Sequence, residues 1–465
     1  MRASAGHPDL SQEIAARMER LPITGFTWRV VVLGSFAWVI ESLSIGALGV
    51  VLPILKPLWT LGAGSVGMLA ISSTIGIVIG LIPAGYLADG YGRKSVLFWG
   101  ILEYGGFTLL SAASPSYAWL VAFRFLSGLG MGAVFPLPYA LISEFVPKHR
   151  RTLFNGIMDS SLSAGYFIAP LLGLLVLPHF APNLAWRGFM CLSGLPLVFA
   201  LIIRRSLPES PRWLSRHGHA DRAFHVLNLM EAKARRKDHR QILAPVEASR
   251  LPAKTAPPTA TGILGPWHRP LVRRTVVLAA AASGTFFMFY IVMTYLPLIF
   301  FREGFSFAAS LRFTALITAA AIPGKLLNGL LGETIGRKWM YVIFMGIAGL
   351  AAIFFGLART PSLMLAYGAL MSFFGTGTFP VLKMSYAEQY PTPLRTTGAA
   401  TVETIGRFLG GVVGPYAFPT LIAAVGLGRG FDLVSLVALI SVAITLAYGQ
   451  ESKQASLEDL EARLH

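Results

Sequence analysis

Eight ionisable side chains interrupt the long apolar stretches of this 465-residue sequence, and they are its first candidates for chemistry. A charge inside hydrocarbon is costly, so such residues usually mark a substrate, ion or proton pathway. Because there are as many acids as bases, we expect them to pair. They are Glu41, Glu103, Asp159, Glu403, Arg124, Lys325, Lys383 and Arg407. No role follows from the sequence for Glu103 or Asp159.

Glu41 is the candidate for proton exchange. It lies in the middle of the first apolar stretch, 12 residues before Pro53. A carboxylic acid in a low-dielectric environment holds its proton more firmly, and a neighbouring arginine opposes this effect. A carboxylate whose distance to such an arginine changes can therefore take up and release a proton. The alternative is a structural buried ion pair.

Arg407 and Lys383 are candidates for binding an anion. Glu403 and Arg407 stand four residues apart, so they either pair along one helix face or leave Arg407 facing a cavity. Lys383 and Lys325 either face a cavity or extend to the lipid headgroups, as long basic side chains near helix ends do.

Aromatic side chains gather in the apolar stretch 275–300. They are Phe286, Phe287, Phe289, Tyr290 and Tyr295. Most aromatic residues of a membrane helix face lipid or pack, but the hydroxyls of Tyr290 and Tyr295 could bond a substrate. Trp38, one turn before Glu41, could likewise stack on a substrate ring.

The composition indicates that a membrane protein positions these groups. Hydrophobic residues make up 54% of the chain and charged residues 13%, about half of the roughly 25% that is typical of soluble chains. The mean hydropathy is +0.62. The single cysteine, Cys191, excludes an intrachain disulfide. The sequence has no G-x-x-x-x-G-K-[ST] run, His/Cys cluster or standout G-x-S-x-G motif, so we predict no enzyme, ATP-driven pump, metal site or cofactor.

Twelve apolar segments are each long enough to cross a hydrocarbon core of about 30 Å. We therefore predict an all-α membrane protein with 12 transmembrane helices. The segments are 28–55, 65–88, 95–113, 117–143, 153–177, 185–203, 275–300, 307–331, 339–357, 362–386, 397–424 and 431–448. The predicted parts are a cytoplasmic N-terminal segment 1–27, a six-helix bundle 28–204, a cytoplasmic central loop 205–274, a second six-helix bundle 275–449 and a cytoplasmic tail 450–465.

The distribution of basic residues predicts the orientation. With both termini and the even-numbered loops on one side, that side has 29 of the 39 Lys and Arg, and the other has six. Cytoplasmic loops collect Lys and Arg, so we expect both termini in the cytoplasm and the chain in an inner or plasma membrane. The net charge of +17 then reflects loops, not nucleic-acid binding. The segment 204–274, with fifteen basic residues, is interpreted as a solvated connection, or alternatively as a lipid-headgroup or partner-binding segment.

The two bundles are predicted to be pseudo-symmetric repeats. Parallel repeats of this kind are typical of transporters with a central site. Four landmarks share one offset of 244 residues: GYLADGYGRKS with GLLGETIGRKW, EFVPKHRR with EQYPTPLR, Phe135-Pro136 with Phe379-Pro380, and Leu52-Pro53 with Leu296-Pro297.

Four runs resemble three signatures of the major facilitator superfamily, and the resemblance covers nearly the whole chain. Residues 85–94 are similar to the superfamily's loop 2–3 signature. Residues 124–130 and 144–151 resemble the fourth-helix signature of its sugar-porter and aromatic-acid/proton symporter branches, and 208–212, P-E-S-P-R, resemble the motif that follows helix six there.

The sequence also departs from these patterns. Gly90 stands where many members have Arg, and Glu333 where the second copy has Asp. Glu41 and Ser44 stand where aromatic-acid symporters tend to have two Asp.

The resemblance implies a transporter that works by alternating access. It implies that the acid of helix 1 and the arginine of helix 4 form the proton-coupling pair, which places that role on Glu41 and Arg124. It also implies that helix 7 lines the cavity, and Arg407 lies in a run similar to a helix 11 pattern of organic-acid symporters. Substrate binding is accordingly assigned to Arg124, Arg407, Lys383, Tyr290, Tyr295 and Trp38.

Charged residues at the predicted cytoplasmic helix ends are candidates for a gate. Ion pairs between them would close the cytoplasmic side and would separate when the halves move apart; the alternative is that they only anchor helix ends. They are Asp89, Arg93, Glu144, Arg151, Glu209, Arg212, Glu333, Arg337, Glu388 and Arg395.

We predict proton-coupled symport of a small organic anion, an aromatic or aliphatic carboxylate, with protons as the coupling ion. The basic residues inside the spans favour an anion. A sugar or polyol symporter and a drug/proton antiporter are the alternative transporters, and a nontransporting sensor is the alternative of another class. The expected partners are this small molecule and the lipid bilayer, and the expected state is a monomer.

Overall fold

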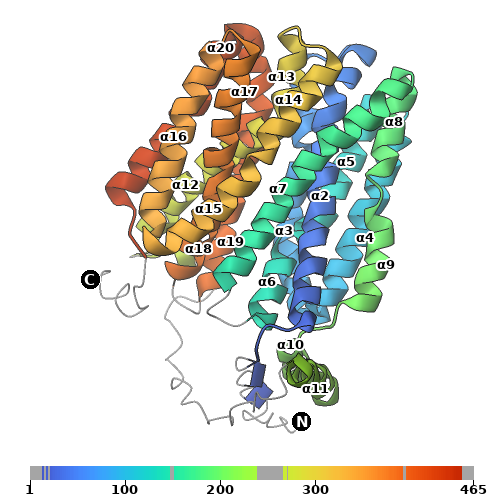
Figure 1. Cartoon of the computed structure of the whole chain (residues 1–465), viewed down its shortest axis with the longest axis vertical. Coiled ribbons are helices and arrows are strands. Elements are labelled where there is room, and N and C mark those ends of the chain that lie inside the picture. Colours follow the sequence, from blue (N-terminus) through green and yellow to red (C-terminus); the bar gives the residue numbers. More distant parts are fainter. Residues whose placement is uncertain are drawn as a thin grey trace.

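The computed structural model describes residues 13–14, 17–18, 21–146, 151–237, 265–269, 271–390 and 394–452. The elements in these ranges are helices, without a strand (Figure 1). The first half of the chain forms α2 (Gly25–Leu58), α3 (Ala63–Tyr91), α4 (Arg93–Ala112), α5 (Tyr117–Val134), α6 (Pro136–Phe145), α7 (Arg151–Val176), α8 (Pro182–Leu192) and α9 (Pro196–Ser206). Two short helices follow, α10 (Pro211–Arg216) and α11 (Ala220–Lys237).

The second half forms a similar series (Figure 1). Its α-helices are α12 (Val272–Tyr290), α13 (Leu296–Arg302), α14 (Phe307–Ala319), α15 (Ala321–Thr334), α16 (Arg337–Leu357), α17 (Pro361–Leu370), α18 (Phe379–Glu388), α19 (Arg395–Gly406) and α20 (Gly414–Tyr448). Three π-helical turns interrupt it, η4 (Ile291–Tyr295), η5 (Met371–Gly375) and η8 (Arg407–Val413).

Prolines explain why these crossings are divided. A proline lacks the backbone N–H and clashes with the preceding turn of a helix. The turn η4 precedes Pro297, η5 precedes Pro380 and η8 precedes Pro415. π-Helical turns are rare and often lie at functional sites, and these three interrupt the crossings that carry Tyr290, Lys383 and Arg407.

Within the described ranges, eleven continuous helical segments are long and apolar enough to cross a membrane. The last of them, Thr397–Tyr448, has 52 residues, or about 78 Å at 1.5 Å per residue, which is more than two hydrocarbon cores. Its chain turns at Gly426, where φ is 85°, so this segment holds the two crossings predicted at 397–424 and 431–448. The all-α fold with twelve crossings is therefore confirmed.

The two halves of the chain pack against each other over a long interface. The helix α7 lies along α14 and α15, α2 contacts α13 and η4, and α3 contacts η8 and α20. Small residues allow the backbones to approach closely. A Cβ atom on Gly49 would lie 2.6 Å from the Thr294 carbonyl oxygen, and one on Gly67 would lie 2.5 Å from that of Tyr416. Both contacts lie in the half of the bundle away from α10 and α11.

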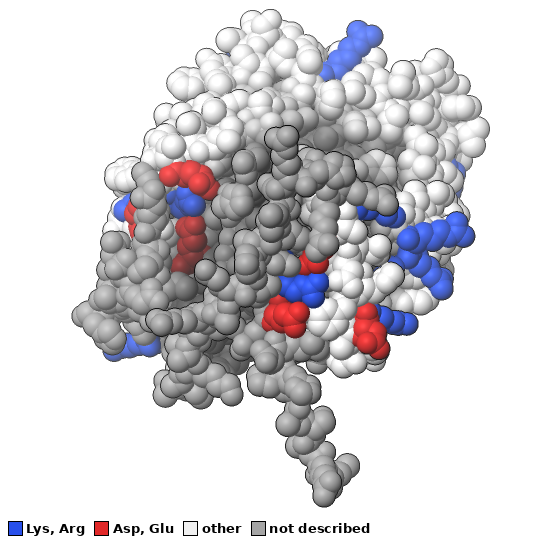
Figure 2. All heavy atoms as spheres, turned by 60° about the horizontal axis from the view of Figure 1, so that its bottom comes forward, with Lys and Arg blue, Asp and Glu red and all other residues white. Residues whose placement is uncertain are grey.

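The end of the bundle that carries α10 and α11 is called the loop face below. The helix α2 begins there and α9 ends there (Figure 1). Charged side chains are frequent on this face, and Lys and Arg gather along one edge of it (Figure 2). Seven charged side chains, called the interior cluster below, lie between this face and the close contacts at Gly49 and Gly67: Glu41, Arg124, Asp159, Lys325, Lys383, Glu403 and Arg407.

Candidate functional site

Arg407 occupies the centre of the bundle. It is the first residue of η8, and only 2% of it is exposed. Its guanidinium forms an ion pair with Glu403 at 3.0 Å and donates a hydrogen bond to the Tyr290 hydroxyl at 3.4 Å. The same group lies 3.9 Å from the ring centre of Phe135 and 4.7 Å from that of Phe286. The Arg407 guanidinium is therefore paired with Glu403 and also lies between one aromatic ring from each half.

Lys383 lies between the two halves in a comparable way. Its Nζ atom is 3.2 Å from the Asp159 carboxylate of α7, in an ion pair that joins the halves. It also lies 4.8 Å from the ring centre of Trp38 and 5.5 Å from that of Phe379. Cation–π contacts of this kind are stronger when the groups are withdrawn from water. The aromatic residue Trp38 that was predicted to stack thus contacts a cation.

The two cations share one arrangement that follows from the repeat. Each lies over a ring from the first half and a ring from the second half. Phe135, under Arg407, and Phe379, beside Lys383, are repeat mates at the offset of 244. The rings of Phe286 and Phe379 also contact each other, with centres 5.1 Å apart. The two halves therefore build one aromatic wall around two cations.

Glu41 is completely buried beside these cations. Neither of its carboxylate oxygens has a hydrogen-bond partner in the described part of the chain. Its charge interacts with those of Arg407 and Lys383 across the interface between the halves. A buried carboxylate without a partner is unfavourable when ionised, so this group is ready to hold a proton or to meet a ligand.

Arg124 lies in a polar pocket on the first-half side of the interior cluster, where its charge and those of Glu41 and Arg407 all act on the buried Tyr166 hydroxyl. Its guanidinium donates hydrogen bonds to the hydroxyls of Ser73 at 3.2 Å and Ser44 at 3.5 Å. The hydroxyl of Thr108 joins those of Ser44 and Ser127 at 3.2 and 2.9 Å. Among the described ion pairs there is none between Glu41 and Arg124. The structure therefore does not bring the two members of the expected coupling pair into contact in this conformation.

The remaining interior residues have defined positions. Lys325 is fully buried and its Nζ donates a hydrogen bond to the Asp159 carbonyl oxygen at 2.9 Å, so it does not extend to the headgroups. The Tyr295 hydroxyl is used internally, donating to the carbonyl oxygen of Pro415 at 2.7 Å. Glu103 lies in the interface of α4 and α5, beside Gly130 and apart from the cluster.

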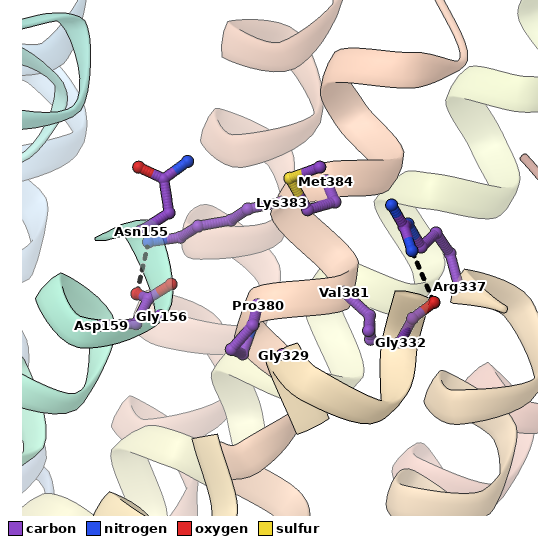
Figure 3. A pocket seen from close by; sticks show the side chains of 10 residues that line it. All are labelled: Asn155, Gly156, Asp159, Gly329, Gly332, Arg337, Pro380, Val381, Lys383 and Met384. Carbon is purple, nitrogen blue, oxygen red and sulfur yellow. Dashed lines mark hydrogen bonds and ion pairs between the residues drawn. The ribbon is translucent and has the colours of Figure 1, made fainter. Parts of the chain in front are cut away.

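A pocket opens between the halves next to the Asp159–Lys383 pair (Figure 3). Figure 3 shows Lys383 reaching across to Asp159 and Asn155 on α7, while Arg337 lies on the far side of Val381. Asp159 is eight residues into α7, about 12 Å from its start at the loop face. The pocket is thus placed between the loop face and the interior cluster.

The predicted gate residues are only partly described. The side chains of Asp89, Glu144, Arg151 and Arg395 lie outside the described residues. Of the others, Glu209 accepts hydrogen bonds from the backbone N–H groups of Arg93 at 3.1 Å and Lys94 at 3.2 Å.

The helix start at Arg93 explains this use of Glu209. Gly92 has φ of 92°, in the region that favours glycine, and a Cβ atom there would collide with the Glu209 carboxylate. The carboxylate therefore satisfies free N–H groups at the N-terminus of α4 and is favoured by the helix dipole. We call this arrangement a carboxylate clamp.

The second half has the same clamp, formed by a residue that the sequence interpretation missed. Gly336 has φ of 114°, and Glu451 accepts hydrogen bonds from the N–H groups of Arg337 at 2.8 Å and Lys338 at 3.1 Å. The signal was present, because Glu451-Ser452 repeats Glu209-Ser210.

The described gate contacts thus lie within each half. The Arg337 guanidinium also pairs with Glu388 at 3.0 Å. Arg212 lies at the start of α10, and Glu333 near the end of α15.

Asp159 is the other site residue to which the sequence gave no role. It joins Lys383 through its carboxylate and Lys325 through its carbonyl oxygen, and it is 1% exposed. A charge on the fifth apolar segment was visible in the sequence. Its orientation toward the other half was not, because the sequence does not specify how α7 is rotated about its axis.

Twelve membrane crossings around a buried charged centre, with an internal repeat, define a membrane transporter. The chain belongs to the Major Facilitator Superfamily, whose family model matches residues 34–324. It is therefore an integral membrane transporter and not an enzyme.

Relatives of known name align over almost the full length. The niacin transporter NiaP of Acinetobacter baylyi is 29% identical over 449 residues, which cover 96% of this chain and 99% of that one. The 4-hydroxybenzoate transporter PcaK of Pseudomonas aeruginosa is 28% identical over 455 residues, 94% of each chain. Among solved structures, the proton:xylose symporter XylE superposes with a TM-score of 0.73 at 17% identity, covering 95% of this chain and 99% of that chain; XylE is from E. coli. That likeness concerns the fold.

Proposed function

We propose that this protein transports a small aromatic monocarboxylate together with protons. The observation that carries the proposal is the pair of cations, Arg407 and Lys383, each lying over rings of both halves. A carboxylate between these cations would be neutralised, and its ring would lie against the aromatic wall. Such charge-assisted contacts are stronger than neutral ones, and ring–ring contacts add further selectivity.

The charge of the interior favours an anion. The cluster contains four basic side chains and three acidic ones when all are ionised: Arg124, Lys325, Lys383, Arg407, Glu41, Asp159 and Glu403. A bound monocarboxylate would reduce the excess positive charge, which is larger still when Glu41 is protonated. A neutral sugar or a cationic drug would leave it uncompensated, which is costly in a low-dielectric interior.

The relatives support the same chemical class. Niacin and 4-hydroxybenzoate, in the names of the two relatives, are both rings that bear one carboxylate. These names describe those proteins. For this chain they add to the argument from Arg407 and Lys383.

Proton coupling would follow from competition for the cations. The Glu41 carboxylate interacts with Arg407 and Lys383, and a bound substrate carboxylate would interact with the same two groups. Binding of the anion therefore favours the protonated form of Glu41, and by linkage protonation of Glu41 favours binding of the anion. Arg124 would then act through the polar pocket around Ser44, with Tyr290 and Trp38 orienting the substrate.

Alternating access would require the Asp159–Lys383 pair to separate. It joins the halves between the site and the loop face, so the halves cannot part there while it is intact. The excess of Lys and Arg in the loops on this side predicts that the loop face is the cytoplasmic one, with the chain in an inner or plasma membrane. The clamps at Glu209 and Glu451 would keep each half rigid as it moves, and the gate contacts would form between these rigid units.

Transport by the purified protein in proteoliposomes tests the proposal. With a pH gradient that is acid outside, we expect labelled benzoate or nicotinate to accumulate faster and further than in protein-free liposomes, which take up only the neutral acid that crosses the bilayer unaided, and a protonophore to abolish this difference. Xylose is the matched neutral probe. Accumulation of xylose without accumulation of either carboxylate would overturn the proposal in favour of a sugar symporter.

A further inference from the structure

A second polar cavity lies outside the transport site, at the edge of the loop face. It is an open groove of about 710 Å³ between the ends of α4 and α9 and the short helices α10 and α11. Three basic side chains line it, Lys94 of α4, Arg204 of α9 and Arg222 of α11. We call it the α4–α9 groove. It shares Glu209 with the clamp, and it is remote in the sequence from Arg407 and Lys383.

The charge of the groove is positive. The Glu209 carboxylate also lines it, but this group already accepts hydrogen bonds from the backbone N–H groups of Arg93, Lys94 and Ser210. Arg204 and Arg222 are exposed; the Arg204 guanidinium lies over the ring of Phe98, 5.5 Å from its centre, and its N–H groups can still donate to a ligand in the groove. Guanidinium groups match the geometry of phosphate oxygens, which makes a phosphate the fitting ligand.

The aromatic lining places the groove at a membrane surface. Tyr91 and Trp99 are 71% and 64% exposed, and Trp213 forms another part of the wall. Tyr and Trp are enriched where a membrane protein crosses from hydrocarbon to headgroups. Next to Arg204, the side chains of Leu201 and Ile202 on α9 are also exposed. An apolar surface thus continues from the groove along the outside of the bundle.

We propose that the α4–α9 groove binds the phosphate of an anionic phospholipid, whose acyl chains lie along the outer surface of α4 and α9. The three basic side chains contact the phosphate, and Trp99 and Tyr91 lie at the level of the glycerol. Basic pockets beside membrane helices are known to take up such headgroups. Inorganic phosphate could form the same polar contacts as the headgroup, but it has no acyl chains to cover the exposed apolar surface beside the groove. The bound lipid would join α11 and the ends of α4 and α9 into one unit.

Native mass spectrometry of the detergent-purified protein tests this assignment. The protein is titrated with phosphatidylglycerol or with zwitterionic phosphatidylcholine of the same acyl chains. We expect the wild type to retain phosphatidylglycerol preferentially. Each of Lys94→Gln, Arg204→Gln and Arg222→Gln is expected to weaken retention about fivefold, and the triple variant about a hundredfold.

Arg205→Gln is the matched control. Arg205 is the adjacent exposed arginine at the end of α9 and does not line the groove, so its replacement is expected to leave lipid retention unchanged. Monodisperse elution in size-exclusion chromatography shows that each variant is folded. A triple variant that is folded and still retains phosphatidylglycerol like the wild type would overturn the proposal. Complete displacement of the lipid by millimolar inorganic phosphate would also overturn it, because the site would then be one for free phosphate.

Discussion

The ion pair between Asp159 and Lys383 provides a quantitative prediction. It joins the two halves at 3.2 Å, with the Asp159 side chain 2% exposed and that of Lys383 18% exposed. Removing one member of a buried pair typically costs about 3–5 kcal/mol. Lys383 would keep its contacts with Trp38 and Phe379 and some access to water, so we expect a smaller loss of about 1–2 kcal/mol from the conformation that contains the pair. This corresponds to a change of about 5- to 30-fold in the population of the conformation that is open at the loop face.

Thiol labelling measures this change. Gly329 lines the pocket beside the pair, and a Cβ atom there would make only an ordinary contact, 3.6 Å from Pro380. Gly329→Cys in a Cys191→Ser background therefore reports access from the loop face. We expect Asp159→Asn to raise the rate of maleimide labelling about 5- to 30-fold, and Lys383→Gln, which leaves the buried Asp159 carboxylate without its ion-pair partner, to raise it at least as much.

A double-mutant cycle decides whether the pair is responsible. Since both substitutions remove the same interaction, the double variant should label about as fast as either single variant, which is strong coupling. Glu103→Gln is the control, because Glu103 lies between α4 and α5 away from the interface of the halves, and it should not change the rate. Fully additive effects of Asp159→Asn and Lys383→Gln, or no effect of either, would refute the reasoning.

Three further predictions concern coupling, binding and stability. Glu41→Gln should abolish uphill uptake of the carboxylate while counterflow persists, because only the proton-binding group is lost; loss of counterflow in a folded variant would instead make Glu41 a binding residue. Arg407→Gln should reduce carboxylate binding in a thermal-shift titration by at least tenfold, as expected for a charge-assisted contact worth about 1.5–3 kcal/mol, whereas Arg312→Gln on the exposed face of α14 should not change it. Gly336→Ala should lower the melting temperature, because a Cβ atom would collide with the Glu451 carboxylate at positive φ. Gly346→Ala, inside the helix α16 that follows Gly336, meets no atom within 4 Å and should be tolerated; equal melting temperatures would contradict the role of the second clamp.

Much of the fold follows from the sequence because hydropathy and chain length set the crossings. The segments near 339–357 and 95–113 agree closely with α16 and α4. The breaks inside crossings are less visible. Pro297, Pro380 and Pro415 signal an interruption, but a proline does not specify whether the chain adjusts by a kink or by a π-helical turn such as η4.

The interior charges could be found from the sequence, but their partners could not. Glu403 and Arg407 pair as their spacing of four allows, because both lie on one helix. The partner of Lys383 is Asp159, 224 residues away, and this pairing depends on how α7 and α18 are rotated about their axes. Hydropathy does not fix this rotation, because each helix is embedded in the bundle and contacts several neighbours.

The internal repeat also relates the two carboxylate clamps. The landmarks at the offset of 244 include Gly92 and Gly336, whose positive φ angles create two equivalent turns. The carboxylates that complete these turns, Glu209 and Glu451, are 242 residues apart. Because the other landmarks are 244 residues apart, an alignment at that offset does not bring Glu451 opposite Glu209. Their equivalence follows from the backbone N–H groups that they bind.

The central claim is that carboxylate and proton cross the membrane together. The direct measurement is the pH inside proteoliposomes, followed by a trapped fluorescent indicator, when benzoate is added outside in the absence of a pH gradient and with the membrane potential clamped. We expect the interior to acidify with the wild-type protein as benzoate enters, and not with Glu41→Gln, after subtraction of the signal from protein-free liposomes. Benzoate entry through the wild-type protein without acidification, or with alkalinisation, would contradict proton symport.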